Sequence, residues 1–231
     1  NLLNSNLEFV KVIPDPGIFV QSKIENNNRF IKTNKLNIII SLNDEDRKFR
    51  FKPFEKRENL IKSFASIIDT IVKKYDANII LVPHYFDDYK AIGELIEFVK
   101  PSIGHRNITA TGLGGIDDGH LFYGLYKKVD LSISMRVHSL SPCIGMGVPL
   151  IAVSTQNRIS NFMKRIGLET QCEDAFDKDF VINMLKKIDF VLNNSANIKI
   201  KQKKVKDNQL FISKNFIKNN IQNFFETDTF Q

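Results

Sequence analysis

The feature that most constrains the fold is a regular alternation of short apolar runs with longer segments in which apolar residues recur every three or four positions. The run Leu36–Leu42 (LNIIISL) is rich in β-branched residues, and apolar residues in the following segment, 55–74, have helical spacing. The same alternation continues along the chain, with further apolar runs at 78–84, 107–111, 130–134 and 149–154. Such an alternation is typical of an α/β domain with a parallel sheet.

The apolar runs lack the strict polar–apolar alternation of a half-exposed strand, which indicates burial on both faces of a sheet. Five or six strand–helix units fit into 231 residues, fewer than the eight units of a closed α/β barrel. The sequence therefore predicts a Rossmann-like, doubly wound parallel sheet with helices on both faces. Helices are expected at 88–99, 119–128, 138–146 and 157–167.

The regions outside this alternation are expected to be a linker and a helical end. The asparagine-rich segment 23–35 predicts a linker into the first strand. After Asp179 the chain is expected to be helical, with a break at the polar stretch 193–202 and a last amphipathic helix at 207–225.

The formal net charge of +7 is concentrated near the C-terminus. Between Lys186 and Asn220, nine lysines face only two acidic residues, Asp189 and Asp207. This composition is typical of a solvated connection before a final helix, or of a contact with anionic lipid headgroups. No aromatic residue interleaves with the lysines of 197–208 to stack on bases, so nucleic acid is not an expected partner.

Composition also bears on location. No apolar run approaches the ~18 residues of a membrane-spanning helix, and the first residues lack the basic-then-apolar order of a secretion signal. The two cysteines, Cys143 and Cys172, have neither a disulfide-framework pattern nor metal-binding spacing, and are expected to be packing residues in a reducing compartment. These features predict a cytoplasmic location.

Polar side chains gather where the predicted strands end. Because the carboxyl ends of parallel strands meet at one edge of a sheet, where helix N-termini attract anions, we expect these side chains to form one binding site. The residues concerned are His84, Asp87 and Asp88 after the second strand, Arg136 and His138 after the fourth, and Ser154, Thr155, Gln156 and Arg158 after the fifth.

Arg136 and His138 are the strongest candidates, since they follow the same strand. A guanidinium offers a planar fork of donors for a carboxylate or a phosphate, and an imidazole binds phosphate oxygen or transfers a proton near neutral pH. The pair favours a small phosphorylated acid as ligand. The structural alternative is a salt bridge for Arg136 and a helix-capping or core position for His138.

Two further motifs have residues that could bind a ligand. Gly114 and Gly115 lie in TGLGGIDDGH (111–120), which lacks the order of a dinucleotide fingerprint and is interpreted as a flexible loop near the site. The acidic pairs 87–88 and 117–118 offer oxygen ligands for Mg²⁺, but adjacent carboxylates are more typical of helix starts and turns. No metal or cofactor is therefore expected.

The segment 130–169 resembles the signature of the polysaccharide pyruvyltransferase family. In that signature a strand leads to an R-x-H step, a helix, a G-x-P step before the next strand, and a basic residue ahead of a short helix and Gly-Leu. The matching residues here are Arg136, His138, Gly147, Pro149, Arg158, Gly167 and Leu168. Upstream, VIPDPGIF (12–19) resembles the segment that joins the family's two halves, and 80–88 resembles its strand-His-acid segment.

The resemblance implies a glycosyltransferase-B-like architecture, in which two Rossmann-like domains enclose a cleft. This chain would correspond to the C-terminal half. Residues 1–35 would be the interdomain crossing segment and linker, and residues 36–231 the donor-binding domain with C-terminal helices. The 231 residues alone would then be an incomplete enzyme, because a missing N-terminal domain helps to bind the acceptor.

The resemblance also implies a transferase of surface-polysaccharide synthesis (capsule or exopolysaccharide) that moves pyruvyl from phosphoenolpyruvate to a sugar as a cyclic ketal. The acceptor would be a saccharide or a lipid-linked saccharide, with the basic tail at the inner face of the membrane. By this resemblance the catalytic residues would be His138 and His84, and the donor-binding residues Arg136, His138, Arg158, Ser154, Gly114 and Gly115.

The chain departs from the family pattern after its first strand, where Asn43 stands in place of an arginine found in many members. Arg47 and Arg50 are the candidates for a second clamp on the donor. The stretch after the fifth strand also lacks an aromatic-x-x-lysine step. Two alternatives stay open: a glycosyltransferase that uses Arg136 and the Gly114 loop to hold a nucleotide sugar, and a non-catalytic binding module of a larger protein.

Overall fold

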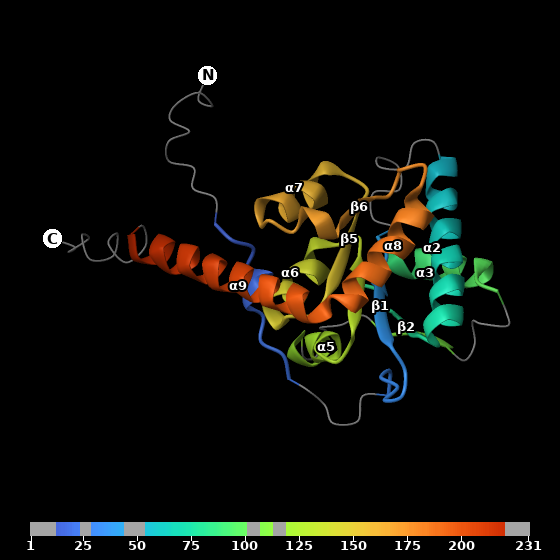
Figure 1. Ribbon diagram of the computed structural model, residues 1–231, viewed down its shortest axis with the longest axis horizontal. Helices are drawn as coiled ribbons and strands as arrows, with labels where there is room; N and C mark the ends of the chain where they lie inside the picture. Colours follow the sequence, from blue (N-terminus) through green and yellow to red (C-terminus); the bar gives the residue numbers. More distant parts are fainter. Residues whose placement is uncertain (1–12, 24–28, 44–53, 101–106, 113–118, 220–231) are drawn as a thin grey trace, which may run out of the picture.

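The computed structural model describes residues 13–23, 29–43, 54–100, 107–112 and 119–219. Its centre is a six-stranded sheet in the order β3-β2-β1-β4-β5-β6, and every neighbouring pair of strands is parallel (Figure 1). The strands are β1 (Asn37–Ser41), β2 (Asn78–Leu81), β3 (Ile108–Ala110), β4 (Leu131–Ser134), β5 (Leu150–Ser154) and β6 (Cys172–Asp174). The predicted doubly wound parallel sheet is confirmed, and the order reverses between β1 and β4, where such sheets bind ligands.

Helices cover both faces of the sheet, as the sequence predicted (Figure 1). One face packs against α2 (Phe54–Tyr75), α3 (Asp88–Phe98) and α8 (Phe180–Asn193). The other face packs against α5 (Gly119–Tyr126), α6 (Val137–Met146) and α7 (Asn157–Arg165).

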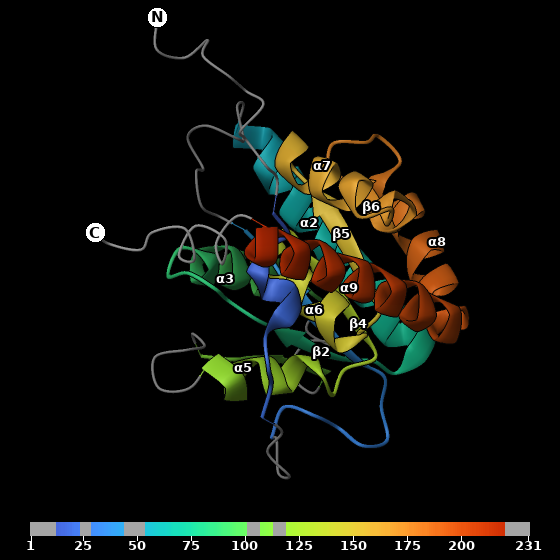
Figure 2. The same ribbon diagram turned by 90° about the vertical axis from the view of Figure 1, so that its left-hand side faces the viewer.

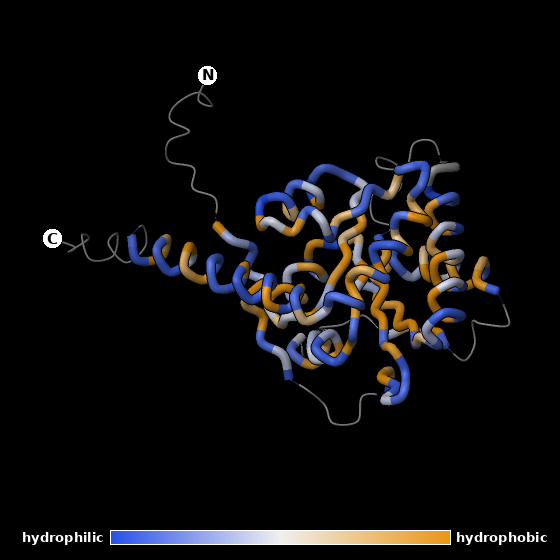
Figure 3. The backbone as a smooth tube through the Cα atoms, in the orientation of Figure 1, coloured by the Kyte–Doolittle hydropathy of each residue, from blue (hydrophilic) through white to orange (hydrophobic). Residues whose placement is uncertain are grey.

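The central strand β1 shows why polar and apolar residues do not alternate along the strands: both of its faces are buried. Ile38 and Ile40 of β1 point into the first helix layer, whereas Ile39 points into the second. Burial of each such side chain contributes roughly 1.5–3 kcal/mol. Apolar residues accordingly concentrate along the strands and on the inner sides of the helices (Figure 3).

The segment 13–23 lies across the outer side of α6 and contains the short helix η2 (Pro16–Phe19). Asp15 caps this helix by accepting a hydrogen bond from the N–H of Gly17 at 2.8 Å. Gly145 of α6 allows the close approach, because a Cβ atom there would collide with the carbonyl of Ile18. Figure 2 shows this segment and the last helix, α9 (Ser195–Ile217), crossing in front of α6.

The predicted break at 193–202 is present but much shorter than expected, and the expected start of the last helix at residue 207 is wrong. A single residue, Asn194, separates α8 from α9, which runs continuously through the lysine-rich stretch. Lysine has good helix propensity, and the helix is fixed by two buried side chains, Ile198 and Gln202. The Gln202 amide donates to the carbonyl of Val148 at 2.9 Å, so a polar residue anchors α9 on the body of the domain.

Candidate anion-binding site

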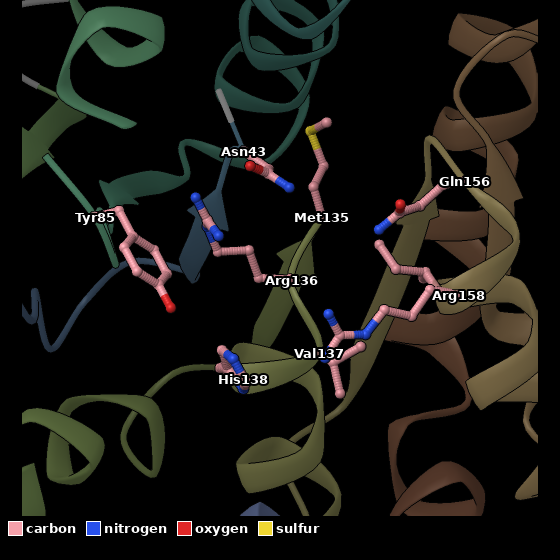
Figure 4. Close-up of a pocket in the computed structure, with 9 residues that line it drawn as sticks. Asn43, Tyr85, Met135, Arg136, Val137, His138, Gln156 and Arg158 are labelled. Atoms are coloured by element: carbon pink, nitrogen blue, oxygen red, sulfur yellow. The ribbon is translucent and has the colours of Figure 1, made fainter. Parts of the chain in front are cut away.

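A cavity of about 110 Å³ lies at the carboxyl ends of the central strands, between the first turns of α6 and α7 (Figure 4). Its lining includes two arginines and a histidine but no carboxylate. An excess of positive charge favours an anionic ligand. The polar residues that line the cavity are Asn43, Tyr85, Arg136, His138, Gln156 and Arg158.

Arg136 is held by a buried ion pair with Asp88, the first residue of α3. Its Nε donates to Asp88 Oδ2 at 3.0 Å, and its Nη2 donates to Asp88 Oδ1 at 2.5 Å. The ring of Tyr85 lies 4.5 Å from Arg136 Cζ and stacks on the guanidinium. Arg136 therefore forms the structural salt bridge that the sequence indicated as the alternative to ligand binding. It also lines the cavity.

Asp88 is fixed independently of the arginine. Its Oδ2 accepts hydrogen bonds from the backbone N–H groups of His84 at 2.9 Å and Tyr85 at 3.0 Å. These bonds give hydrogen-bond partners to a carboxylate that is completely buried. The loop after β2 thus presents a rigid acceptor that sets the orientation of Arg136.

Two helix N-termini add positive partial charge at the cavity. The residues preceding α6 and α7, Arg136 and Gln156, make no side-chain capping bond, and neither first turn contains an acidic residue. The first N–H groups of a helix lack intrahelical acceptors and attract anions. Arg158, in the first turn of α7, makes no ion pair within the described residues and is exposed at the cavity mouth.

His84 lies beside this cavity rather than in its lining. Its Nε2 is 2.9 Å from the hydroxyl of Tyr126, and its ring meets the edge of Phe122. Burial, and then the charge of Arg136, lower the pKa of His84 from 6.5 to about 4. His84 is therefore neutral near pH 7.

Tyr126 connects His84 to the start of α6. Its hydroxyl accepts a hydrogen bond from Ser139 Oγ at 3.1 Å. Burial raises the pKa of Tyr126 well above 10, so the phenol keeps its proton. With Ser139 as donor, that proton is directed at Nε2 of His84, which places the imidazole proton on Nδ1. Ser139, Tyr126 and His84 form a buried chain of hydrogen bonds behind the cavity.

The structure brings together three of the residues expected from the sequence, namely Arg136, His138 and Arg158 (Figure 4). His138 is exposed, whereas Ser154 is buried, donates to the carbonyl of Gln156 at 2.8 Å and lines a neighbouring cavity. Four further candidates lie outside the described residues: Arg47, Arg50, Gly114 and Gly115.

The sequence placed Gln156 among the polar residues at the strand ends, but it did not single out Tyr85. Tyr85 follows His84 directly and Gln156 precedes α7, so both stand at strand ends, where the sequence placed the site. Within the described part of the chain, no group of three or more histidine, cysteine, aspartate or glutamate side chains is arranged to hold a metal ion.

The fold and the cavity define a Rossmann-like α/β domain with a cavity lined by two arginines and a histidine at its strand ends. The family described as polysaccharide pyruvyl transferase matches residues 2–157 of the sequence. The match covers more than half of the chain, and the protein belongs to this family. A search of curated proteins finds no match.

Solved structures show the same glycosyltransferase-B-like fold. The chain covers 84% of the C-terminal domain of a group 1 glycosyl transferase from Francisella tularensis, which covers 76% of this chain (TM-score 0.50, 14% identity). A mutant O-GlcNAc transferase from Thermobaculum terrenum covers 85% of the chain (TM-score 0.53, 12% identity), and a trehalose-6-phosphate synthase covers 80% (TM-score 0.52, 9% identity). The chain spans only 35% and 43% of these two proteins, respectively.

Proposed function

We propose that this chain is the donor-binding part of a pyruvyltransferase of surface-polysaccharide biosynthesis. The donor is phosphoenolpyruvate and the product is a sugar that carries a pyruvate ketal. Residues 36–231 form the donor-binding domain, and residues 1–35 are the crossing segment from an N-terminal domain that takes part in acceptor binding. Membership of the polysaccharide pyruvyl transferase family supports the class of reaction.

The observation that carries the proposal is the cavity between α6 and α7. Phosphoenolpyruvate is small and carries a carboxylate and a phosphate. The cavity is small as well, has no acidic residue in its wall, and presents Arg136, Arg158 and His138 beside two helix N-termini. The exposed Arg158 and the two helix ends suit the phosphate, while Arg136, whose Nε and Nη2 are bound to Asp88, forms the part of the wall assigned to the carboxylate.

The reaction requires two additions to one carbon atom. A proton is added to the methylene carbon of phosphoenolpyruvate while a sugar hydroxyl attacks the neighbouring carbon. The bond from that carbon to the phosphate oxygen then breaks, phosphate leaves, and a second sugar hydroxyl closes the ketal. Of the two hydroxyl protons, one accounts for the new methyl group and the other leaves with phosphate.

His138 is the group we assign to proton transfer, because it is exposed at the cavity wall. His84 has a different role in this proposal. Its Nε2 is occupied by Tyr126 and its pKa is lowered to about 4, so at neutral pH it orients the loop that holds Asp88 rather than supplying a proton.

The acceptor is proposed to be a saccharide or lipid-linked saccharide, at the cytoplasmic face of a membrane. Support comes from α9, whose outer side carries Lys199, Lys203 and Lys204 beside exposed Ile200 and Phe211. Basic residues next to apolar ones suit an anionic lipid surface. No helix in the described part of the chain is long and apolar enough to cross a membrane.

Calorimetry tests the donor assignment. The protein is titrated with phosphoenolpyruvate and, separately, with nucleotide sugars. Phosphoenolpyruvate should bind, and the variant His138→Ala should retain binding within a few fold while losing release of inorganic phosphate in the presence of acceptor. Nucleotide-sugar binding without any response to phosphoenolpyruvate would instead favour a glycosyltransferase. Full transfer activity by His138→Ala would contradict the catalytic role of that imidazole.

A further inference from the structure

A second cavity, of about 430 Å³, lies at the carboxyl ends of β5 and β6. It is separated from the donor cavity by the first turn of α7, and Gln156 lines both. Asn157, Ser160 and Lys164 lie along the side of α7 that faces the second cavity, whereas Arg158 faces the donor cavity. The two cavities are therefore neighbours with a shared wall.

The second cavity differs from the first in charge. Three carboxylates, from Glu169, Glu173 and Asp174, line it against one lysine, Lys164. This balance disfavours a phosphate or a carboxylate ligand, because like charges repel across a partly enclosed space. The remaining lining offers amide and hydroxyl groups, together with the ring of Phe176, which is 40% exposed.

Amides, hydroxyls, carboxylates and one exposed ring can recognise a neutral polyhydroxyl compound. Such groups donate to and accept from sugar hydroxyls, and an aromatic ring packs against the apolar face of a pyranose. The volume lies within the range of about 300–1,000 Å³ of small-molecule sites. Thr155 at the wall also has a buried hydroxyl with no hydrogen-bond partner among the described residues.

We propose that this second cavity binds a sugar unit of the acceptor, beside the donor cavity. The inference rests on the proposed function, because it assigns the two cavities to the donor and the acceptor of one reaction. The second cavity places hydroxyl-binding groups against a wall that it shares with the donor cavity at Gln156.

Asp174 is the residue we assign to a sugar hydroxyl. Its Oδ1 accepts from the N–H of Phe176 at 2.9 Å, and Oδ2 has no hydrogen-bond partner within the described residues. Glu173 is less available, because Asn183 donates to its Oε1 at 3.3 Å and Lys187 lies 3.4 Å from its Oε2. Asp174 can therefore accept a hydrogen bond from the acceptor.

The variant Asp174→Asn tests this assignment, since asparagine keeps the oxygen that Phe176 needs. Asp177→Asn is a matched control: Asp177 is exposed, accepts a similar local bond from the N–H of Asp179 at 2.7 Å, and does not line the second cavity. Saturation-transfer NMR measures binding of methyl β-D-glucopyranoside and methyl β-D-galactopyranoside in the absence of donor. Calorimetry measures phosphoenolpyruvate binding to the same proteins.

At least one glycoside should bind the wild-type protein and the control alike, and about tenfold more weakly to Asp174→Asn, because a hydrogen bond to a charged group is lost. Phosphoenolpyruvate affinity should be unchanged in both variants. Absence of glycoside binding to the wild type, or equal binding by all three proteins, would overturn the inference even if phosphoenolpyruvate binds. Failure of phosphoenolpyruvate to bind, with glycoside binding that depends on Asp174, would instead overturn the proposed function and leave a saccharide site.

Discussion

The carboxylate of Asp88 binds the guanidinium of Arg136 through two hydrogen bonds, although 48 residues separate the two in the sequence. Both side chains are almost completely buried. Asp88 is thus a positioning residue for the proposed donor site: it fixes the orientation of Arg136 while Tyr85 stacks on the guanidinium. The pair also links the loop after β2 to the loop after β4, on either side of β1.

Asp88→Asn should destabilise the protein by about 3–5 kcal/mol, because removal of one partner leaves a buried charge uncompensated. Urea denaturation at neutral pH measures the loss. Asp87→Asn is the control: Asp87 pairs with Lys90 at 3.0 Å on the exposed side of the same turn, and this change should cost less than about 1 kcal/mol. Equal losses of stability from the two changes would show that the buried ion pair stabilises the protein no more than the exposed pair does.

Replacing Arg158 should weaken donor binding without lowering the stability of the protein, unlike the replacement of Asp88. A cation in the first turn of a helix is opposed by the helix dipole, so Arg158→Ala should leave the free energy of unfolding unchanged or raise it by up to about 0.5 kcal/mol. Phosphoenolpyruvate affinity should fall about tenfold, as a charged hydrogen bond to phosphate is lost. Arg165→Ala is the control, since Arg165 lies in the last turn of the same helix and outside the donor cavity. An unchanged phosphoenolpyruvate affinity in Arg158→Ala would remove this arginine from the donor site.

The sequence predicted those parts of the fold that depend on local apolar patterns. Five strands and the helices between them were predicted within a few residues, because each is marked by a buried apolar run or by helical periodicity. The strand β6 was not predicted, since Cys172–Asp174 is three residues long and mostly polar. Its position depends on pairing with β5, which no local pattern reveals.

The site could be predicted in part for the same reason. Strand ends are visible in the sequence, and Arg136, His138 and Arg158 were found there. The pairing of Arg136 with Asp88 depends on which strands become neighbours, so the sequence placed Asp88 near a strand end without indicating its partner. The continuity of α9 was missed because a solvated helix and a polar connection have the same composition.

The exposed side of α9 should bind anionic lipid. Replacing Lys199, Lys203 and Lys204 together by glutamine should weaken binding to vesicles that contain phosphatidylserine by about 100-fold, at roughly 1 kcal/mol for each lysine. Flotation of vesicles with and without the anionic lipid measures this binding. Replacing Lys62, Lys73 and Lys90, which lie on α2 and α3, is the matched control. A wild-type protein that does not float with anionic vesicles would overturn the membrane assignment.

Tyr126→Phe should destabilise the protein more than the loss of a hydroxyl near the surface does. The change removes the hydroxyl that joins Ser139 to His84, and leaves two buried polar groups without their partner. A loss of about 1–3 kcal/mol is expected in urea denaturation. Tyr123→Phe, on the same helix, removes a hydroxyl that is bonded to the carbonyl of His138 near the surface, and should cost less. If Tyr126→Phe is as stable as the wild type, the chain of hydrogen bonds behind the cavity contributes nothing to folding.

The lowered pKa of His84 predicts a specific pH dependence of stability. The pKa falls from 6.5 to about 4 in the folded protein, because burial and the charges of Arg136 and His138 outweigh the opposing effect of Asp88. Between these two pH values the unfolded chain binds more protons at this residue than the folded chain does. Its contribution to stability is therefore present above pH 6.5 and is lost as the pH falls towards 4, by about 3 kcal/mol in total.

His84→Gln should remove this dependence while keeping a polar group next to Tyr126. Urea denaturation of the wild type at a series of pH values from 7 to about 4 should give a free energy of unfolding that declines more steeply than that of His84→Gln. His120→Gln is the control, because His120 is exposed and its change leaves His84 and its buried surroundings in place. Parallel pH profiles for the wild type and His84→Gln would show that the imidazole is accessible to protons in the folded state, and would contradict its assignment as a neutral, buried orienting group.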